Sequence, residues 1–157
     1  MVSLAVVLVA AGSGSRYGGD KLAESVGGRS VLECSVAALA AACPEAPMVV
    51  VLPTGRIAHW RPVLDRARCG TVLVAGGDRR QDSVRRGVEA AAESGSDTVV
   101  IHDAARPLVQ PFDIIATLAA IRDADAAILC GRVVDTVKRV DAAGTVVETL
   151  DRDCLRL

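Results

Sequence analysis

The sequence predicts a three-layer α/β/α fold, in which helices cover both faces of a mostly parallel β-sheet. Hydrophobic residues make up 51% of the chain and aromatic residues only 2%, so the core must be built from Ala, Val, Leu and Ile, which suits helices layered on a sheet. Valine-rich apolar runs recur along the chain with helical spacing between them, as expected for strands that are covered on both faces. A length of 157 residues fits one domain, residues 1–157.

The apolar runs predict the strands and the polar residues between them predict where helices begin. The strands are expected at residues 4–9, 48–52, 71–74, 98–101 and 126–129. Ser30 with Glu33, and Asp78 with Gln81, have the spacing of a capping box, and Pro111 suits the first turn of a helix. The elements therefore alternate β-α-β-α-β-α-β-α-β.

The last part of the chain has a different pattern. Two extended stretches, residues 133–140 and 145–150, flank Asp141-Ala142-Ala143-Gly144, which is typical of a hairpin turn. A two-stranded ribbon is marginally stable alone. We therefore expect this arm, residues 132–152, to lean on a second copy of the chain and form a homodimer.

Charge and cysteine usage restrict the class of partner and the compartment. The formal net charge of −1 gives no general attraction to nucleic acid or to an anionic membrane, and the apolar run near the N-terminus is far shorter than the ~20 residues that span a bilayer. We expect neither as a partner. The five cysteines form no C-x-x-C pair, which predicts reduced, mostly buried thiols in a reducing cytoplasm.

A glycine-rich loop after the first strand is the first sign of chemistry. It reads Ala10-Ala11-Gly12-Ser13-Gly14-Ser15-Arg16, with Lys21 shortly after. Glycine lets backbone N–H groups approach a triphosphate, and the two cations add positive charge. Tyr17 stands where a dinucleotide-binding motif needs its third glycine, and the second strand ends without an acid for a ribose, which disfavours a reductase. The alternative is a glycine turn that joins the strand to the next helix and binds no ligand. The two cations favour a phosphate-binding loop over such a turn.

Two further motifs lie at later strand ends. Ile101-His102-Asp103-Ala104-Ala105-Arg106-Pro107 places an acid and a guanidinium where open α/β sheets bind ligands, and such a pair can hold a metal or hydroxyl beside a phosphate. We interpret His102 as a packed strand histidine. The run from Gly76 and Gly77 through Asp78 to Ser83 predicts a turn and a helix start that can contact a base edge. Arg79, Arg80, Arg85 and Arg86 are interpreted as a solvated face without a catalytic role.

Together with Asp135-Thr136-Val137-Lys138-Arg139 and Asp151-Arg152, these motifs resemble the 2-C-methyl-D-erythritol 4-phosphate cytidylyltransferases, in the order found in that family. The resemblance implies a Rossmann-like nucleotidyltransferase fold. It also implies a reaction of the non-mevalonate route to isoprenoids, in which CTP and methylerythritol phosphate give CDP-methylerythritol and pyrophosphate with Mg²⁺.

The resemblance further implies a role for individual residues. Arg16 and Lys21 are the expected catalytic cations at the α-phosphate. Asp103 and Arg106 are expected to contact the methylerythritol phosphate or, for Asp103, the metal. Thr136 and Arg152 are expected to reach the substrate of a neighbouring subunit. The implied nucleotide-binding residues are Ala10, Ala11, Gly12, Gly14, Gly77, Asp78, Ser83 and Ala104. Because a substrate phosphate is itself the nucleophile, catalysis reduces to alignment and charge neutralisation.

Two alternatives stay open at this point. One is a cytidylyltransferase that acts on ribitol 5-phosphate, and the other is a catalytically inert nucleotide-binding or dimerisation module. The family continues beyond Asp151-Arg152 with a Thr-Pro-Gln segment and a lysine-bearing helical region, neither of which occurs before Leu157. We therefore expect weak or absent turnover from these residues alone, with CTP binding retained. Residues 18–22 depart from the family and resemble the molybdopterin guanylyl- and cytidylyltransferases.

Overall fold

The computed structural model describes residues 3–12, 18–68 and 70–157. The chain divides into two compact units, residues 1–118 and 119–157. The boundary falls inside a helix, ahead of the arm boundary expected at residue 132. The expectation of a single domain stays a prediction.

The first unit is built on a parallel sheet with the strand order β5-β4-β1-β6. Its strands are β1 (Leu4–Val9), β4 (Met48–Leu52), β5 (Val72–Ala75) and β6 (Thr98–Asp103). The bounds of β1 and β4 are those predicted, β5 is displaced by one residue, and β6 continues two residues further, to Asp103. The two central strands, β1 and β4, consist almost entirely of buried residues, which explains their continuous apolar sequences.

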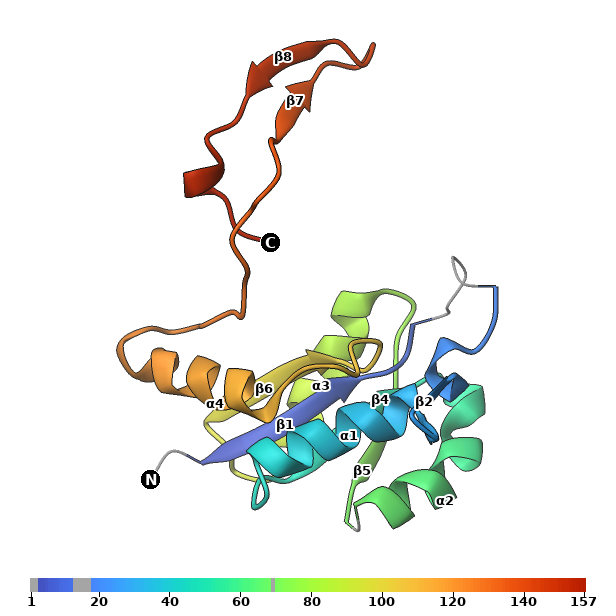
Figure 1. Ribbon diagram of the computed structural model, residues 1–157. Helices are drawn as coiled ribbons and strands as arrows, with labels where there is room; N and C mark the ends of the chain where they lie inside the picture. Colours follow the sequence, from blue (N-terminus) through green and yellow to red (C-terminus); the bar gives the residue numbers. More distant parts are fainter. Residues whose placement is uncertain (1–2, 13–17, 69) are drawn as a thin grey trace. The chain divides into compact units, whose positions relative to one another are not determined.

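Helices cover both faces of this sheet, as the sequence predicts. They are α1 (Val31–Ala42), α2 (Ile57–Ala67), α3 (Arg80–Ala92) and α4 (Pro111–Ala120). Figure 1 shows α1 and α2 in front of the strands and α3 behind them. Alternate residues of β1 point to opposite faces, so that Val6 and Leu8 join one buried cluster while Val7 and Val9 join the other.

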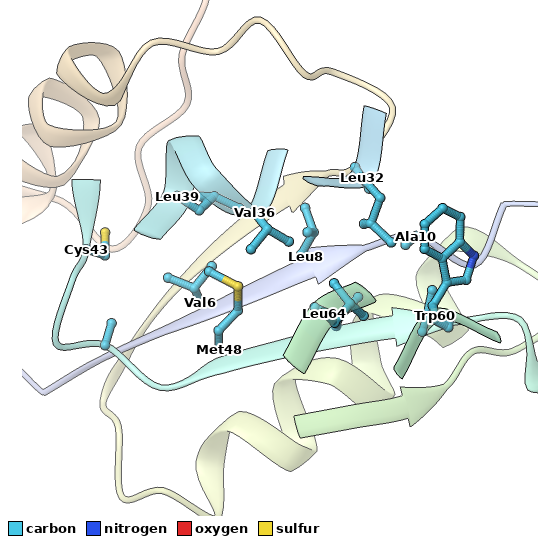
Figure 2. Packing of buried hydrophobic residues seen from close by; sticks show 14 of the residues in the cluster. Val6, Leu8, Ala10, Leu32, Val36, Leu39, Cys43, Met48, Trp60 and Leu64 are labelled. Carbon is cyan, nitrogen blue, oxygen red and sulfur yellow. The ribbon is translucent and has the colours of Figure 1, made fainter. Parts of the chain in front are cut away.

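The larger cluster lies between the sheet and the helices in front of it. Leu32, Val36 and Leu39 of α1 meet Val6 and Leu8 of β1 there (Figure 2). Trp60 and Leu64 of α2 belong to the same cluster, and Trp60 lies beside Ala10 in Figure 2. The smaller cluster lies on the α3 side and includes Ala91. The three-layer α/β/α prediction is therefore confirmed.

The predicted strand at residues 126–129 is not formed. These residues have no strand assignment, and among the described residues the parallel sheet ends at β6. Ile128 is 82% exposed. A short apolar run becomes a strand only when its backbone groups pair with a neighbouring strand, and residues 126–129 pair with none of the described strands. The prediction was wrong because it rested on composition alone.

Two of the three predicted helix starts are confirmed. Glu33 N–H donates to Ser30 Oγ at 3.2 Å and Ser30 N–H donates to Glu33 Oε2 at 2.9 Å, which is the capping box expected at α1. Hydrogen bonds from Ser30 lower the pKa of Glu33 below its ordinary value. Pro111 is the first residue of α4.

The start of α3 differs from the prediction by one residue. Arg79, not Asp78, is the N-cap. The carboxylate of Asp82 accepts hydrogen bonds from the Arg79 backbone N–H at 3.3 Å and from its Nε at 3.0 Å. The hydrogen bond with the Arg79 side chain lowers the pKa of Asp82. The Asp82 carboxylate therefore fixes the start of α3 at Arg79. The capping box predicted for Asp78 with Gln81 is wrong.

Short elements connect the glycine-rich loop to α1. η1 (Lys21–Ala23) is a 3-10 helix, and β2 (Ser25–Val26) pairs with β3 (Arg29–Ser30) in a small hairpin. Its two turn residues, Gly27 and Gly28, have φ values of +59° and +82°, a left-handed conformation that glycine adopts readily. A second 3-10 helix, η2 (Thr54–Arg56), follows β4.

The second unit contains the predicted hairpin. β7 (Lys138–Val140) and β8 (Val146–Thr149) pair antiparallel. Asp141 closes the turn, because its N–H donates to the Thr145 carbonyl at 3.0 Å and its Oδ1 accepts from the Ala143 N–H at 2.9 Å. At the other end, Gly131 and Leu157 exchange two backbone hydrogen bonds of 2.8 and 3.0 Å. The strands are shorter than predicted. The unit also contains η3 (Ile121–Asp123) and η4 (Arg152–Cys154).

The structure bears on membrane spanning and on the thiols. No helix among the described residues is long and apolar enough to cross a membrane. The cysteines that the structure describes are free thiols, of which Cys43 is buried and Cys34 half-buried, whereas Cys130 and Cys154 are exposed. Burial raises the pKa of Cys43. The expectation of mostly buried thiols is therefore wrong for the two in the second unit.

Candidate functional site

The carboxyl ends of the strands gather the predicted motifs at one edge of the sheet. Val9 is in register with Val51 on one side and with Asp103 on the other. The chain builds outward from β1 to β4 and β5, and then returns to the opposite side of β1 to form β6. In open α/β sheets such a switch of direction is where ligands bind. The candidate site therefore lies where the loops after β1 and β6 diverge.

The glycine-rich loop leaves β1 from the core and becomes exposed within three residues. Ala10 is buried and its N–H donates to the Val51 carbonyl at 2.8 Å. Ala11 is half-buried and Gly12 is exposed. Gly14 and Arg16 lie outside the described residues. The described part of the loop thus offers small side chains beside the switch point, as phosphate binding by backbone N–H groups requires.

The loop after β5 touches the loop after β1. A Cβ atom placed on Gly76 would lie 2.3 Å from the Cβ of Ala11 and 2.8 Å from Oγ of Ser83, so only glycine permits this approach. The Gly77 N–H donates to Ser83 Oγ at 3.1 Å, and Arg86 Nη1 donates to the Gly76 carbonyl at 2.6 Å. The predicted nucleotide-binding residues that the structure describes in these two loops are therefore brought together.

The individual side chains in the loop after β5 differ in accessibility. Ser83 is 2% exposed, and its hydroxyl lies inside the loop, where it also donates to the Arg79 carbonyl at 3.3 Å. Asp78 is exposed. In this structure Ser83 supports the loop from within, while Asp78 and the backbone of Gly77 form the part that a ligand can reach.

Asp103 stands at the centre of a charged cluster at the end of β6. Its Oδ1 accepts hydrogen bonds from Arg80 Nε at 2.9 Å and Arg80 Nη2 at 2.8 Å. Arg106 Nε lies 3.8 Å from its Oδ2. Arg80 is exposed, as the sequence interpretation placed it, but its pairing with Asp103 was not predicted. The available signal was its position as the first residue of the helix that follows Gly77 and Asp78.

The turn that carries Asp103 is held at several points. Ala104 is fully buried, its N–H donates to the Val9 carbonyl at 2.9 Å, and its carbonyl accepts from Ser35 Oγ at 2.8 Å. His102 Nε2 lies 3.0 Å from the Arg106 carbonyl. The side chain of His102 therefore closes the turn between β6 and Arg106, which is a structural use of the imidazole.

Lys21 begins η1 and its side chain is exposed. The preceding residue, Asp20, caps η1 by accepting a hydrogen bond from the Leu22 N–H at 3.2 Å, and it forms an ion pair with Arg56. The cap and the ion pair fix the backbone on which Lys21 is carried. Neither Asp20 nor Arg56 was among the site residues expected from the sequence.

Asp103 is the carboxylate expected to bind the metal. Among the described residues, no group of three or more His, Cys, Asp or Glu side chains is placed to hold a metal ion. Mg²⁺ in nucleotide enzymes is commonly held by one or two carboxylates together with substrate phosphates and waters. The partly exposed Asp103 carboxylate fits such a site, in which the substrate supplies further oxygen ligands.

Thr136 and Arg152 lie in the second unit, and both are exposed. The Leu150 N–H donates to the Val137 carbonyl at 2.9 Å, and Arg152 Nη1 donates to the Val134 carbonyl at 2.8 Å. These bonds bring the chain that carries Thr136 alongside the chain that carries Arg152. Within this unit, the structure therefore places the two predicted arm residues in the same region.

Comparison with known proteins identifies the family. The family model for IspD, 2-C-methyl-D-erythritol 4-phosphate cytidylyltransferase, matches residues 4–157. A bifunctional enzyme IspD/IspF from Clavibacter michiganensis subsp. michiganensis is 44% identical over 97% of this chain and 38% of its own length. The 2-C-methyl-D-erythritol 4-phosphate cytidylyltransferase of Cereibacter sphaeroides (strain KD131) is 39% identical over 96% of this chain and 68% of its own length.

A solved structure agrees with these relatives. The crystal structure of 4-diphosphocytidyl-2C-methyl-D-erythritol synthase from Anaerococcus prevotii DSM 20548 superposes with a TM-score of 0.87 at 26% identity, and covers 99% of this chain and 68% of that one. The chain thus spans about two fifths of the bifunctional relative and about two thirds of the shorter ones. Because the family model matches nearly all of its length, this chain belongs to the 2-C-methyl-D-erythritol 4-phosphate cytidylyltransferase family.

Proposed function

We propose that the protein transfers the cytidylyl group of CTP to 2-C-methyl-D-erythritol 4-phosphate, giving CDP-methylerythritol and pyrophosphate. Family membership supports the reaction class. The observation that carries the proposal is that Val9, after which the glycine-rich loop begins, is in register with Asp103 and its two arginines at the switch point of the sheet. The chain spans only part of the length of its relatives, so activity from these residues is itself part of the proposal.

The loops after β1 and β5 suit the nucleotide. Their contact at Ala11 and Gly76 makes a surface of small side chains, on which backbone N–H groups can face the phosphates of CTP. We expect the exposed Asp78 and the backbone of Gly77 to contact the cytosine edge. Ser83 and Arg86, which hold this loop from behind, would preserve its shape when CTP binds.

The reaction needs charge neutralisation rather than a general base. A phosphate oxygen of the acceptor attacks the α-phosphorus of CTP, a new P–O bond forms, and the bond to the β-phosphate breaks to release pyrophosphate. Since the acceptor phosphate is already an anion near neutral pH, no side chain has to remove a proton from it. Arg16 and Lys21 neutralise charge at the α-phosphate, and Arg106 holds the acceptor phosphate beside it.

Asp103 is the proposed protein ligand of Mg²⁺, with the triphosphate supplying further oxygens. The bound ion would offset the negative charge of the CTP phosphates. Arg80 Nη2 donates a hydrogen bond to Oδ1 of Asp103. We infer that Arg80 keeps this carboxylate oriented toward the site before the nucleotide arrives.

The arm is proposed to complete the site across a homodimer, with Thr136 and Arg152 contacting the acceptor bound by the neighbouring subunit. Exposed valines on the arm support a partner that covers them. These valines are Val134, Val140, Val146 and Val147, which are 51–75% exposed. The exposed thiols of Cys130 and Cys154 suit a reducing cytoplasm, and the net charge of −1 suits a small anionic substrate held by local cations rather than a nucleic acid.

The test is pyrophosphate release from CTP and Mg²⁺ with three reactions side by side. One contains methylerythritol phosphate, one contains ribitol 5-phosphate, and one contains no acceptor. Release only with methylerythritol phosphate supports the proposal. Release only with ribitol 5-phosphate reassigns the acceptor. CTP binding without release in any reaction would mean that residues 1–157 form a nucleotide-binding module.

A further inference from the structure

We propose that Arg56 is a positioning residue for Lys21, acting through its ion pair with Asp20. The inference rests on the proposed function, in which Lys21 neutralises charge at the α-phosphate. We call the ion pair between Asp20 and Arg56 the clamp. It would hold the backbone at Lys21 without contacting the substrate.

The clamp joins segments that are 36 residues apart in the chain. Arg56 Nη2 donates to Oδ2 of Asp20, while the other carboxylate oxygen accepts the Leu22 N–H at 3.2 Å. Arg56 ends η2, which follows β4, and Asp20 immediately precedes Lys21. A single carboxylate therefore connects the end of a central strand to the start of η1.

Lys21 is held on both sides by these contacts. Before it, Asp20 is fixed by Arg56 and its carbonyl accepts the Ala23 N–H at 3.0 Å. After it, Leu22 packs against the larger buried cluster. A 3-10 helix of three residues has weak hydrogen-bond geometry of its own, so these external contacts determine where the Lys21 backbone lies.

Arg56 is itself suited to act as the fixed end of the clamp. Its N–H donates to the Pro53 carbonyl at 2.8 Å, directly after the buried strand β4. Its Nε is buried and has no hydrogen-bond partner among the described residues. The ion pair with Asp20 is therefore the main polar contact of this guanidinium within the described structure. Since partly exposed ion pairs add little to global stability, we expect the effect of breaking it to be local to η1.

The first measurement is the dissociation constant of CTP with Mg²⁺, determined by titration calorimetry on the full chain. Arg56→Ala removes the cation, and Asp20→Asn removes the charge while keeping an acceptor for the Leu22 N–H. Each should raise the dissociation constant about fivefold or more, within the range of couplings inside one network, and leave cytidine binding unchanged. Arg56→Lys should restore most of the affinity. Arg61→Ala, on the exposed side of α2, is the matched control and should have no effect.

A double-mutant cycle then separates this positioning role from a general structural one. In a Lys21→Gln background, Arg56→Ala should weaken CTP binding no further, because the group that it positions has been removed. Where turnover is measurable, Arg56→Ala should lower kcat about tenfold or more, with KM for the acceptor unchanged. Equal losses in both backgrounds would overturn the proposal, as would unchanged CTP affinity in both Arg56→Ala and Asp20→Asn.

Hydrogen exchange provides a readout that does not depend on CTP. The amides of Leu22 and Ala23 should exchange faster in Arg56→Ala, while those of β1 keep their native rates, which also shows that the variant is folded. Unchanged exchange at Leu22 and Ala23 would overturn the clamp. Failure of the unaltered chain to bind CTP would instead overturn the proposed function, so the two failures are distinguishable.

Discussion

Asp103 is shared between two arginines that reach it from different elements. Arg80, at the start of α3, makes two hydrogen bonds to Oδ1, and Arg106, in the turn after β6, approaches Oδ2. Hydrogen bonds between ionised groups are stronger and more directional than neutral ones. The orientation of the Asp103 carboxylate therefore depends on Arg80, which sets the geometry that a metal or an acceptor would meet.

Removal of Arg80 tests this dependence. We expect Arg80→Ala to lower the rate of pyrophosphate release about tenfold or more, because a displaced reacting or binding group costs up to 10²-fold. Arg85→Ala is the matched control in the same helix, where the arginine pairs at 3.4 Å with Glu89, and its rate should stay within about twofold of the unaltered chain. Equal rates for the two variants would show that the orientation of Asp103 does not depend on Arg80.

The two proposed catalytic cations should have the largest effects. Arg16→Ala and Lys21→Ala are each expected to lower kcat about 10²–10³-fold, the scale of a lost donor to developing charge. Circular dichroism and thermal unfolding should be unchanged, since Lys21 is exposed. Steady-state kinetics with saturating CTP is the measurement, and unchanged kcat in both variants would remove these residues from the mechanism.

Residue pairs mark the limit of what the sequence could predict. Asp103 and Arg106 were accessible because they belong to one short strand-end motif. Arg80 lies 23 residues from Asp103, and Arg56 lies 36 residues from Asp20. Their contacts exist only because parallel strands bring distant loops to the same edge of the sheet. The position of Arg80 at a helix start after Gly77 and Asp78 could mark it as a site residue, but no local pattern in a single sequence records which residue it contacts.

At the scale of elements, burial explains both the successes and the failure of strand prediction. β1 and β4 are central and buried, so their apolar runs coincide with their bounds. β6 continues through two polar residues, His102 and Asp103, because backbone pairing with Leu8 and Val9 does not require apolar side chains. Residues 126–129 show the converse, since an apolar run without a paired neighbour forms no strand.

The capping box of α1 predicts a pH-dependent contribution to stability. Hydrogen bonds from Ser30 lower the pKa of Glu33 in the folded state, so near the ordinary glutamate pKa of about 4.3 the unfolded chain binds more protons than the folded one. This contribution is complete above that pH and is lost as the pH falls through the folded-state pKa. Glu33→Gln keeps an acceptor but cannot titrate.

Urea unfolding at pH 7 and pH 3.5 measures this effect. The unaltered chain should lose more stability between the two pH values than Glu33→Gln does. Because Glu33 is near the surface, other carboxylates will contribute to the total, and only the difference between the two proteins is assigned to Glu33. Identical pH dependence in the two proteins would contradict the lowered pKa.

Close packing of α3 on the sheet depends on Gly87. A Cβ atom at this position would lie 2.5 Å from Cγ1 of Val7 and 2.8 Å from Cγ2 of Val51. Overpacking of this kind costs about 1–3 kcal/mol, of which better helix propensity offsets at most about 1 kcal/mol. We expect Gly87→Ala to lower the free energy of unfolding by about 1–2 kcal/mol in denaturant titrations. Gly55→Ala, where a Cβ meets nothing within 4 Å, is the control and should be nearly neutral.

At the scale of the whole molecule, the two units are stabilised in different ways. Nearly all of the buried apolar residues belong to residues 1–118, whereas in residues 119–157 Val133 is the buried apolar side chain among those described. The hairpin relies on backbone pairing and on polar contacts such as the ion pair between Arg139 and Glu148. Such a ribbon gains most of its stability from whatever covers it, which is the physical basis of the homodimer proposal.

The cross-strand pair Val140 and Val146 tests whether a second copy provides that cover. Burying a valine contributes about 1.5 kcal/mol or more, so the double variant Val140→Ser with Val146→Ser should raise the dimer dissociation constant about 100-fold or more in sedimentation equilibrium. The control is Arg139→Ser with Glu148→Ser, which removes an exposed ion pair and should change that constant little. CTP binding should persist in both, since the described nucleotide loops belong to the first unit. A monomeric unaltered chain would contradict the dimer, and an unchanged constant in the valine variant would exclude this pair from its interface.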